Sequence, residues 1–272
     1  MRLMGLGHAV FAVALAGLGV LSLGSGDFAY VSQPVPAWVI GRGLLVYASG
    51  ALLLACGAGL LWPRTLARSS LVLTLYGMAS MLLLHAPRIA REPLNEVEWF
   101  NLGEIATIVA GAWILFACAA PVPASRWRKA VVGERGVRLA RLLFALALPP
   151  FGLSHFVYAK ATAGMVPSWL PGHLAWAYLT GAGHVAAGLG ILLGVLPRLA
   201  ATLEALMVST FLLTVNVPDL VGAPRDRWQW TEVFVASAIG GAAFLVARSY
   251  RGERWLAIHL PGGARSLVRR GD

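Results

Sequence analysis

Eight apolar stretches, each about 20 residues long, divide the chain. They cover residues 4–24, 38–62, 68–86, 100–120, 139–159, 172–195, 198–217 and 230–247. Only helices and closed barrels satisfy the backbone in lipid, and these stretches are too long and too continuously apolar for barrel strands. The pattern therefore predicts an all-α, polytopic membrane protein with eight transmembrane helices.

The composition supports a membrane protein and excludes a soluble class. Hydrophobic residues make up 58% of the chain and charged residues 12%, whereas a soluble domain is about 25% charged. The net charge of +10 would suggest nucleic acid as a partner of a soluble protein. Here the arginines and lysines lie between apolar stretches, where they signal topology. We expect a lipid bilayer as the partner and no nucleic acid.

The basic residues also predict the orientation of the helices. Sixteen arginines and lysines fall on one predicted side of the membrane and six on the other. Because basic residues accumulate on the cytoplasmic side, both termini are predicted to be cytoplasmic. The expected location is the plasma membrane of a bacterium, and the short loops rich in tryptophan and proline then lie on the outer face.

An internal repeat organises the chain. One constant shift, which we call the repeat spacing, carries Pro36, Trp38, Pro87 and Trp99 onto Pro167, Trp169, Pro218 and Trp230, and several glycines match as well. Four helices per copy give both copies the same orientation, as in a parallel repeat about an axis near the membrane normal. We therefore predict a first four-helix repeat at 1–120, a basic cytoplasmic linker at 121–138, a second repeat at 139–248 and a basic cytoplasmic tail at 249–272.

Ionisable residues near the predicted outer half are the candidate ligand-binding groups, because burying them in lipid is costly. They include two glutamates at equivalent places near the outer ends of the fourth and eighth helices. A histidine and a lysine end the fifth helix. A histidine opens the sixth, and another follows three turns later on the same face. We predict a pocket near the outer face, between the two repeats, lined by some of Glu104, His155, Lys160, His173 and Glu232, with His184 at its floor.

Three interpretations of these residues stay open. They could be helix caps and interhelical hydrogen bonds, they could line a pocket for a quinone or another small redox molecule, or His85, His155 and His173 with a glutamate could hold a metal or haem. No single helix carries a histidine pair with metal-ligand spacing, and two cysteines cannot supply a four-thiolate cluster. We expect no metal site, no catalytic residue and no tightly bound cofactor, whereas quinone is compatible with the pattern.

The second half resembles the DoxX family of small bacterial membrane proteins. The resemblance rests on FGLSHFVYAK, VPSWLP and LTGAGHVAAGLGILLG, followed by PRLAA. The first half, from GDFAYVSQPVPAW to LHAPRIA, is similar to a more diverged copy. The resemblance implies four-helix units and, in some members, association with redox enzymes such as a thiosulfate:quinone oxidoreductase. Lys160 matches the family's lysine, but His184 stands where the family commonly has an acidic residue.

These observations predict an accessory or quinone-interacting subunit of a membrane redox system rather than an enzyme acting alone. Its expected partners are redox proteins and a small hydrophobic ligand. The alternatives are a small-molecule transporter and a structural membrane scaffold. A transporter should contain helices broken in mid-membrane, and we expect the prolines to lie at helix ends.

Overall fold

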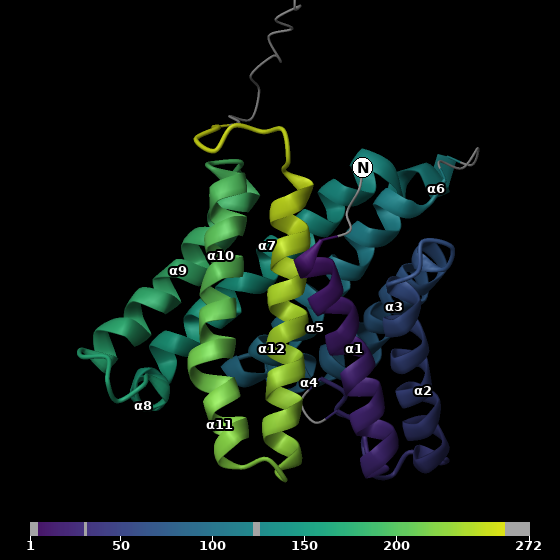
Figure 1. Cartoon of the computed structure of the whole chain (residues 1–272), viewed down its shortest axis with the longest axis horizontal. Coiled ribbons are helices and arrows are strands. Elements are labelled where there is room, and N and C mark those ends of the chain that lie inside the picture. The colour runs from purple at the N-terminus through teal and green to yellow at the C-terminus, as the bar shows by residue number, and fades with distance from the viewer. Residues whose placement is uncertain (1–4, 30–31, 122–125, 259–272) are drawn as a thin grey trace, which may run out of the picture.

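The computed structural model describes residues 5–29, 32–121 and 126–258 and is all-helical within them apart from one isolated bridge (Figure 1). Eight helical spans are long and apolar enough to cross a membrane. Four come before residue 120: α1 (Leu6–Ser25), α2 (Arg42–Leu60), the α3–η1–α4 span (Leu66–Arg91) and α5 (Glu96–Ala119). The other four are α7 (Gly133–Val157), α9 (His173–Leu193), the α10–η2–α11 span (Pro197–Gly222) and α12 (Arg227–Ser249).

Two spans run further than the sequence pattern predicts. We expected helices to end near Pro87 and Pro218, but each continues through a π-helical turn, η1 (Met81–His85) or η2 (Leu212–Asn216), into α4 (Ala86–Arg91) or α11 (Val217–Gly222). Each proline follows directly in the first turn of the next helix. A proline has no N–H to donate and clashes with the carbonyl four residues earlier, and a widened turn relieves both problems.

The expectation that the prolines lie at helix ends was wrong for α7. Pro149 and Pro150 lie inside this helix. The helix also begins at Gly133, within the predicted linker, which contains the short helix α6 (Arg126–Val131) as well. The first turns of α7 carry exposed Glu134, Arg135 and Arg138, so the helix extends past its apolar stretch. Charge marks where the lipid-facing part ends, not where the helix ends.

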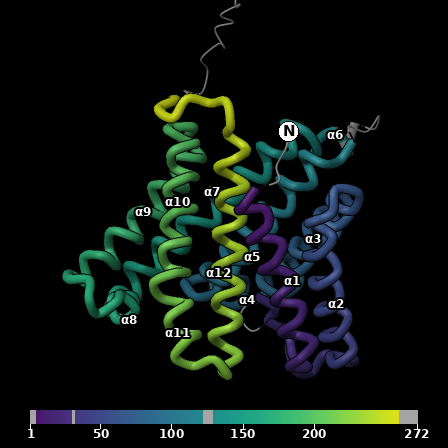
Figure 2. Tube along the Cα trace, in the orientation of Figure 1, coloured from purple at the N-terminus to yellow at the C-terminus, as the bar shows by residue number. Residues whose placement is uncertain are grey.

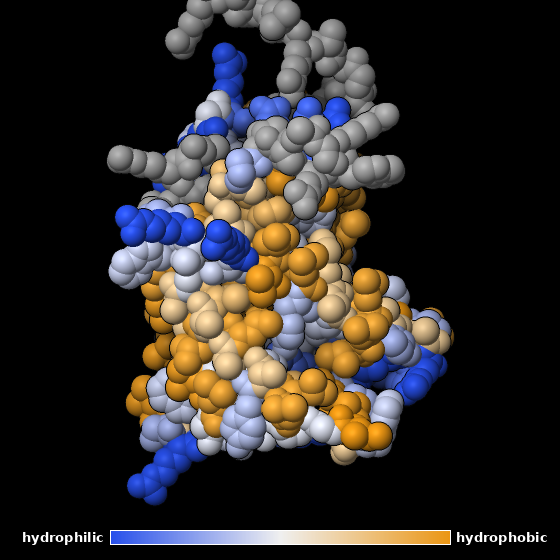
Figure 3. Space-filling view, turned by 90° about the vertical axis from the view of Figure 1, so that its right-hand side faces the viewer, coloured by the Kyte–Doolittle hydropathy of each residue, from blue (hydrophilic) through white to orange (hydrophobic). Residues whose placement is uncertain are grey.

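The helix α5 is the centre of the bundle. Its apolar stretch is 72% buried inside the protein, against 22% for the α10–η2–α11 span. It packs against α3, α7 and α12, while α12 also packs against α1 and α10. In Figure 2 the yellow-green α12 runs between the purple α1 and the green α10. The α2 and α3–η1–α4 spans are also little buried, at 33% and 39%, and hydrophobic residues cover much of the side on which they lie, shown in orange in Figure 3.

Glycines allow two helix pairs to approach closely. A Cβ added at Gly57 of α2 would lie 2.5 Å from the backbone nitrogen of Ala16 in α1. A Cβ at Gly188 of α9 would lie 2.8 Å from the carbonyl oxygen of Ala145 in α7. Small residues at helix contacts are the usual device in lipid, where apolar burial gives little driving force. Here the glycines serve packing, in the same way at two positions that lie one repeat spacing apart.

The element boundaries repeat with the same spacing. From α2 to α4 and from α9 to α11, every helix and π turn begins one repeat spacing after its counterpart, and so does α12 relative to α5. The first turns agree in detail: Asn95 and Asp226 each cap a helix by accepting from a backbone N–H two residues on. Trp99 and Trp230 each donate from Nε1 to a proline carbonyl six residues earlier, at 2.9 Å.

The N-terminal end of α1, helix α6 and the C-terminal end of α12 lie at one end of the molecule, the upper end in Figure 1. From there residues 250–258 cross to the turn between α9 and α10. The Leu196 N–H donates to the Ala257 carbonyl at 2.8 Å, and the Arg198 guanidinium lies 3.9 Å from the centre of the Trp255 ring. We call residues 250–258 the C-terminal strap.

Candidate functional site

A histidine–glutamate pair is buried between α9 and α10. His184 Nδ1 and Glu204 Oε1 share a hydrogen bond of 2.8 Å, and the two residues are 3% and 1% exposed. The turn that joins the helices is short: Gly194 ends α9 in the left-handed conformation and Pro197 begins α10. This tight hairpin brings together two ionisable residues from the middle of predominantly apolar helices.

Aromatic rings surround the pair. The His155 ring lies edge-on to the His184 ring, with centroids 5.2 Å apart. Phe151 and Phe211 approach His184 at 5.6 and 6.1 Å. His155 Nδ1 shares a separate hydrogen bond of 2.8 Å with the Thr180 hydroxyl. The structure thus joins two of the sequence-predicted residues, the half-buried His155 and the buried His184, in one cluster.

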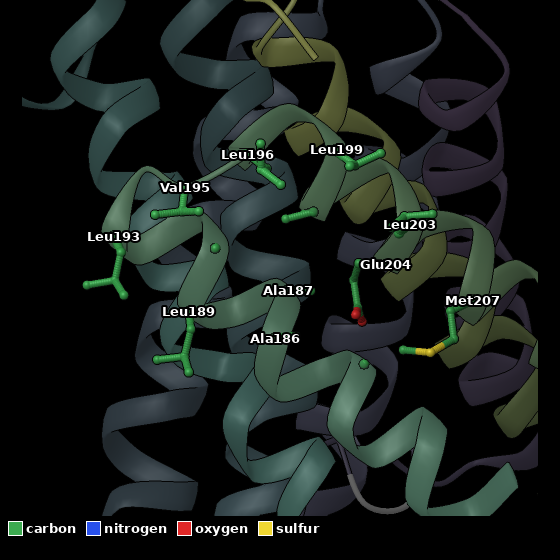
Figure 4. Close-up of a pocket in the computed structure, with 13 residues that line it drawn as sticks. Ala186, Ala187, Leu189, Leu193, Val195, Leu196, Leu199, Leu203, Glu204 and Met207 are labelled. Atoms are coloured by element: carbon green, nitrogen blue, oxygen red, sulfur yellow. The ribbon is translucent and has the colours of Figure 1, made fainter. Parts of the chain in front are cut away.

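An apolar groove runs along the same two helices. Its volume is about 450 Å³, and Glu204 is the one residue with a charged or hydrogen-bonding side chain among the described residues that line it. Figure 4 shows the Glu204 carboxylate pointing into the space between α9 and α10. The other lining residues are small or aliphatic: Gly183, Ala186, Ala187, Leu189, Gly190, Leu193, Val195, Leu196, Leu199, Ala200, Leu203 and Met207.

The second oxygen of Glu204 has no hydrogen-bond partner. Oε1 is held by His184, but Oε2 is buried and unpartnered among the described residues. Buried polar atoms in native proteins are nearly always hydrogen-bonded, so each exception needs an explanation. At the floor of an apolar groove, an unpaired carboxylate oxygen is a ready-made acceptor for a ligand.

The other predicted residues lie elsewhere. Glu104 of α5 is 9% exposed, and Glu232 lies on α12, which packs against α5. They are not equivalent in the repeat, because the repeat spacing pairs them with Val235 and Asn101. The described contacts include no hydrogen bond that joins either glutamate to the histidines.

Lys160 and His173 are also apart from the buried pair. Lys160 is exposed on the short helix α8 (Ala159–Met165), and His173 is half-buried at the first position of α9. His173 and His184 share a helix face as predicted, but three turns of helix separate them by about 16 Å. None of the six predicted residues lines the groove, although His184 bonds to the glutamate at its floor.

A second hollow of about 430 Å³ does lie between the first and second halves. Trp99, Pro149, Pro150, Leu153, Phe156 and Val185 line it. None of these side chains titrates, so this hollow offers no ionisable anchor for a polar ligand group. The described residues also contain no cluster of three or more His, Cys, Asp or Glu side chains placed to hold a metal ion.

Glu204 was missed by reasoning from the sequence. The available signal was a single carboxylate in the middle of the apolar stretch 198–217, where an ionisable residue has a high cost. Its partner lies 20 residues away on the preceding helix. Only the rotation of the two helices in the hairpin shows that the residues meet.

Comparison with known proteins gives one match. A family model described as a domain of unknown function (DUF8561) matches residues 139–251. This range covers most of α7 and all of α9 to α12, including the His184–Glu204 pair. No curated protein and no solved structure matches the chain.

Proposed function

We propose that the protein is a DoxX-like membrane subunit that binds a small lipophilic molecule of the quinone type between α9 and α10. It serves a membrane redox system as an accessory component. The observation that carries this proposal is the Glu204 carboxylate at the floor of an apolar groove, held on one side by His184 and unpaired on the other. Small-molecule sites are typically apolar hollows of about 300–1,000 Å³ with a few placed polar groups.

The proposal includes a gene duplication that made two parallel four-helix repeats. The repeated boundaries, the two π turns and the two tryptophan–proline hydrogen bonds support it. The packing agrees, because α5 packs on α7 as α12 packs on α1, and α5 and α12 also pack on each other. Such reciprocal contacts are expected when one unit is related to the other by an approximate two-fold axis.

Only the second repeat carries the polar pair. At the repeat spacing, Leu53 and Leu73 stand in the places of His184 and Glu204. Tyr76 stands in the place of Met207, and its hydroxyl is held by Ser49 at 2.6 Å. The first repeat has apolar residues and an internally satisfied tyrosine where the second has a groove and an unpaired acceptor. This asymmetry supports one ligand site per chain, with the first repeat as a structural partner.

The proposed location is a bacterial plasma membrane with both termini in the cytoplasm. The support is the distribution of arginine and lysine along the sequence. With this orientation, the α9–α10 turn and the C-terminal strap lie at the cytoplasmic end, and the groove opens to lipid in the cytoplasmic half. A lipophilic molecule would then enter from the membrane rather than from water.

A transporter is the second candidate function. The observation in its favour is the Pro149–Pro150 pair inside α7, together with the π turns in two other spans. Irregular backbone within spans is a feature of many transporters with internal repeats. Flux of the ligand across proteoliposomes distinguishes the two, because an accessory binding subunit binds without net movement.

Blocking the groove tests the proposed function. A Cβ at Gly183 would lie 3.1 Å from Met207 Sδ across the groove, so Gly183→Leu should fill the site. Gly43→Leu is the matched control, since nothing lies within 4 Å of a Cβ there. We expect photolabelling by an azido derivative of decylubiquinone to map to α9 and α10, and to be lost in Gly183→Leu but kept in the control. Equal labelling of both variants would contradict the proposed function.

A further inference from the structure

The unpaired oxygen of Glu204 restricts which chemical groups the groove can accept. His184 and Glu204 together have three neutral proton arrangements: an imidazolium–carboxylate ion pair, an acid that donates from Oε1 to Nδ1, and an acid with its proton on Oε2. In the first two, the proton lies in the 2.8 Å contact between Nδ1 and Oε1. Oε2 is then a hydrogen-bond acceptor.

The third arrangement is disfavoured. It replaces a charge-assisted or acid–imidazole hydrogen bond by a weaker one from neutral imidazole to a carbonyl oxygen. It also leaves a buried O–H donor without an acceptor, because Oε2 has no partner among the described residues. Unpaired buried donors are rarer in proteins than acceptors that lack a partner. Oε2 therefore offers lone pairs, not a proton. The Glu204 side chain is fully covered from solvent, so a ligand hydroxyl reaches Oε2 where the side chains at the floor of the groove move aside.

Nothing else in the described lining reverses this preference. The remaining lining residues have aliphatic side chains, apart from glycine and the Met207 thioether, which is a weak acceptor. The lining comes from α9, α10 and the turn between them. Helical N–H groups after the first turn bond to carbonyls one turn earlier, and the N–H groups of Val195 and Leu196 in the turn bond to the Gly190 and Ala257 carbonyls. A ligand that carries only carbonyl oxygens would place an acceptor against an acceptor.

We infer that the groove selects lipophilic molecules that donate a hydrogen bond at their polar end, such as a phenol or hydroquinone, over carbonyl-only forms such as a quinone. The inference rests on the proposed function, since it assumes that the groove is the ligand site. The donor hydroxyl lies against Glu204 Oε2, and the apolar body lies along the leucines of α9 and α10. For a quinone pool, the site would hold the reduced form.

Matched pairs of probes test the selection. The first pair is 4-nonylphenol and 4-nonylanisole, which differ by methylation of the hydroxyl and have no redox chemistry. The second is durohydroquinone and duroquinone under anaerobic conditions. Binding of each probe alone to the purified full-length protein is measured by isothermal titration calorimetry, so that no quinone label is present for the hydroquinone to reduce. We expect the donor of each pair to bind at least about tenfold more tightly, the ratio that one charge-assisted hydrogen bond can supply.

Substitution of the carboxylate locates the selection. In Glu204→Leu both members of each pair should bind with similar affinity, and in Gly183→Leu neither should bind. A donor-to-acceptor ratio near one in the natural protein overturns the inference, and so does a ratio unchanged in a folded Glu204→Leu protein. If Glu204→Leu does not fold, the donor-to-acceptor ratio measured in the natural protein decides the question by itself. If both members of a pair bind equally and Gly183→Leu abolishes this binding, the selection is refuted and the proposed function stands. If Gly183→Leu leaves binding unchanged, the selection and the proposed function are both refuted.

Discussion

Removing His184 should destabilise the protein more than a typical membrane hydrogen bond would suggest. Interhelical hydrogen bonds in lipid contribute about 0.6 kcal/mol on average and about 1.7 kcal/mol at most. Glu204 is 1% exposed, and His184 provides its one hydrogen bond among the described residues. Oε2 is already unpaired in the natural protein, so His184→Leu leaves one more buried oxygen, Oε1, without a partner. An unsatisfied buried group costs about 1–3 kcal/mol, and we expect a loss of that size.

A double-mutant cycle separates the energy of the His184–Glu204 interaction from the packing energy of the two side chains. Glu204→Leu leaves only a neutral imidazole unpaired, so its loss should be smaller, about 1 kcal/mol. The double variant places two leucines where the first repeat already has Leu53 and Leu73, and its loss should not exceed about 1 kcal/mol. These values give a coupling energy of roughly 2 kcal/mol, at or above the upper end for membrane hydrogen bonds.

The measurement is reversible unfolding of the purified protein in bicelles or mixed micelles. Thr202→Val is the matched control on α10, because the Thr202 hydroxyl bonds within its own helix to the Arg198 carbonyl at 2.7 Å. It should cost less than about 1 kcal/mol. If the four proteins of the cycle give a coupling below about 0.5 kcal/mol, His184 and Glu204 do not depend on each other and the buried pair is not the anchor described here.

Three further outcomes are expected. In a cysteine-free background, a cysteine at Ala163 should react with an impermeant thiol reagent added outside cells and one at Gly133 should not; the reverse result would invert the topology. Trp255→Ala should lower stability by about 1 kcal/mol and make the C-terminal strap more sensitive to protease, because the ring covers Arg198. Unchanged proteolysis would show that the Arg198–Trp255 contact does not hold the strap. Burial opposes ionisation of Asp27, but hydrogen bonds and charge from two arginines outweigh burial and lower the pKa of Asp27. The ion pair therefore stabilises the fold above the ordinary carboxyl pKa near 4, and this stabilisation is lost as the pH falls below that value. Asp27→Asn should reduce the loss of stability in acid, and an identical acid profile would contradict the pairing.

The sequence was sufficient to predict features that depend on the residues of one helix alone. Apolar length predicted eight spans, which the structure contains. The repeat spacing pairs Gly57 with Gly188, and both positions lie at close helix contacts that a Cβ would obstruct. Each of these properties depends on period and length along one segment, so a linear pattern records it.

Features that depend on how helices rotate against each other could not be predicted from the pattern of apolar and polar residues. Glu204 faces His184 because the short turn from Gly194 to Leu196 fixes the rotation of α10 against α9. Proline was taken as a helix terminator, but a π turn lets the span continue past Pro87. The two glutamates near the outer ends looked equivalent, yet the repeat offsets them by nearly one helical turn. In each case a prediction from local sequence failed because the geometry of a neighbouring turn or helix determined the outcome.

The most direct measurement is a structure of the protein purified from its own membrane, at a resolution that shows bound molecules. If the groove is the ligand site, density for a lipophilic molecule lies between α9 and α10, with a polar atom about 3 Å from Glu204 Oε2. A groove closed by α9 and α10, with Oε2 bonded to another group of the protein, would refute the assignment of the site.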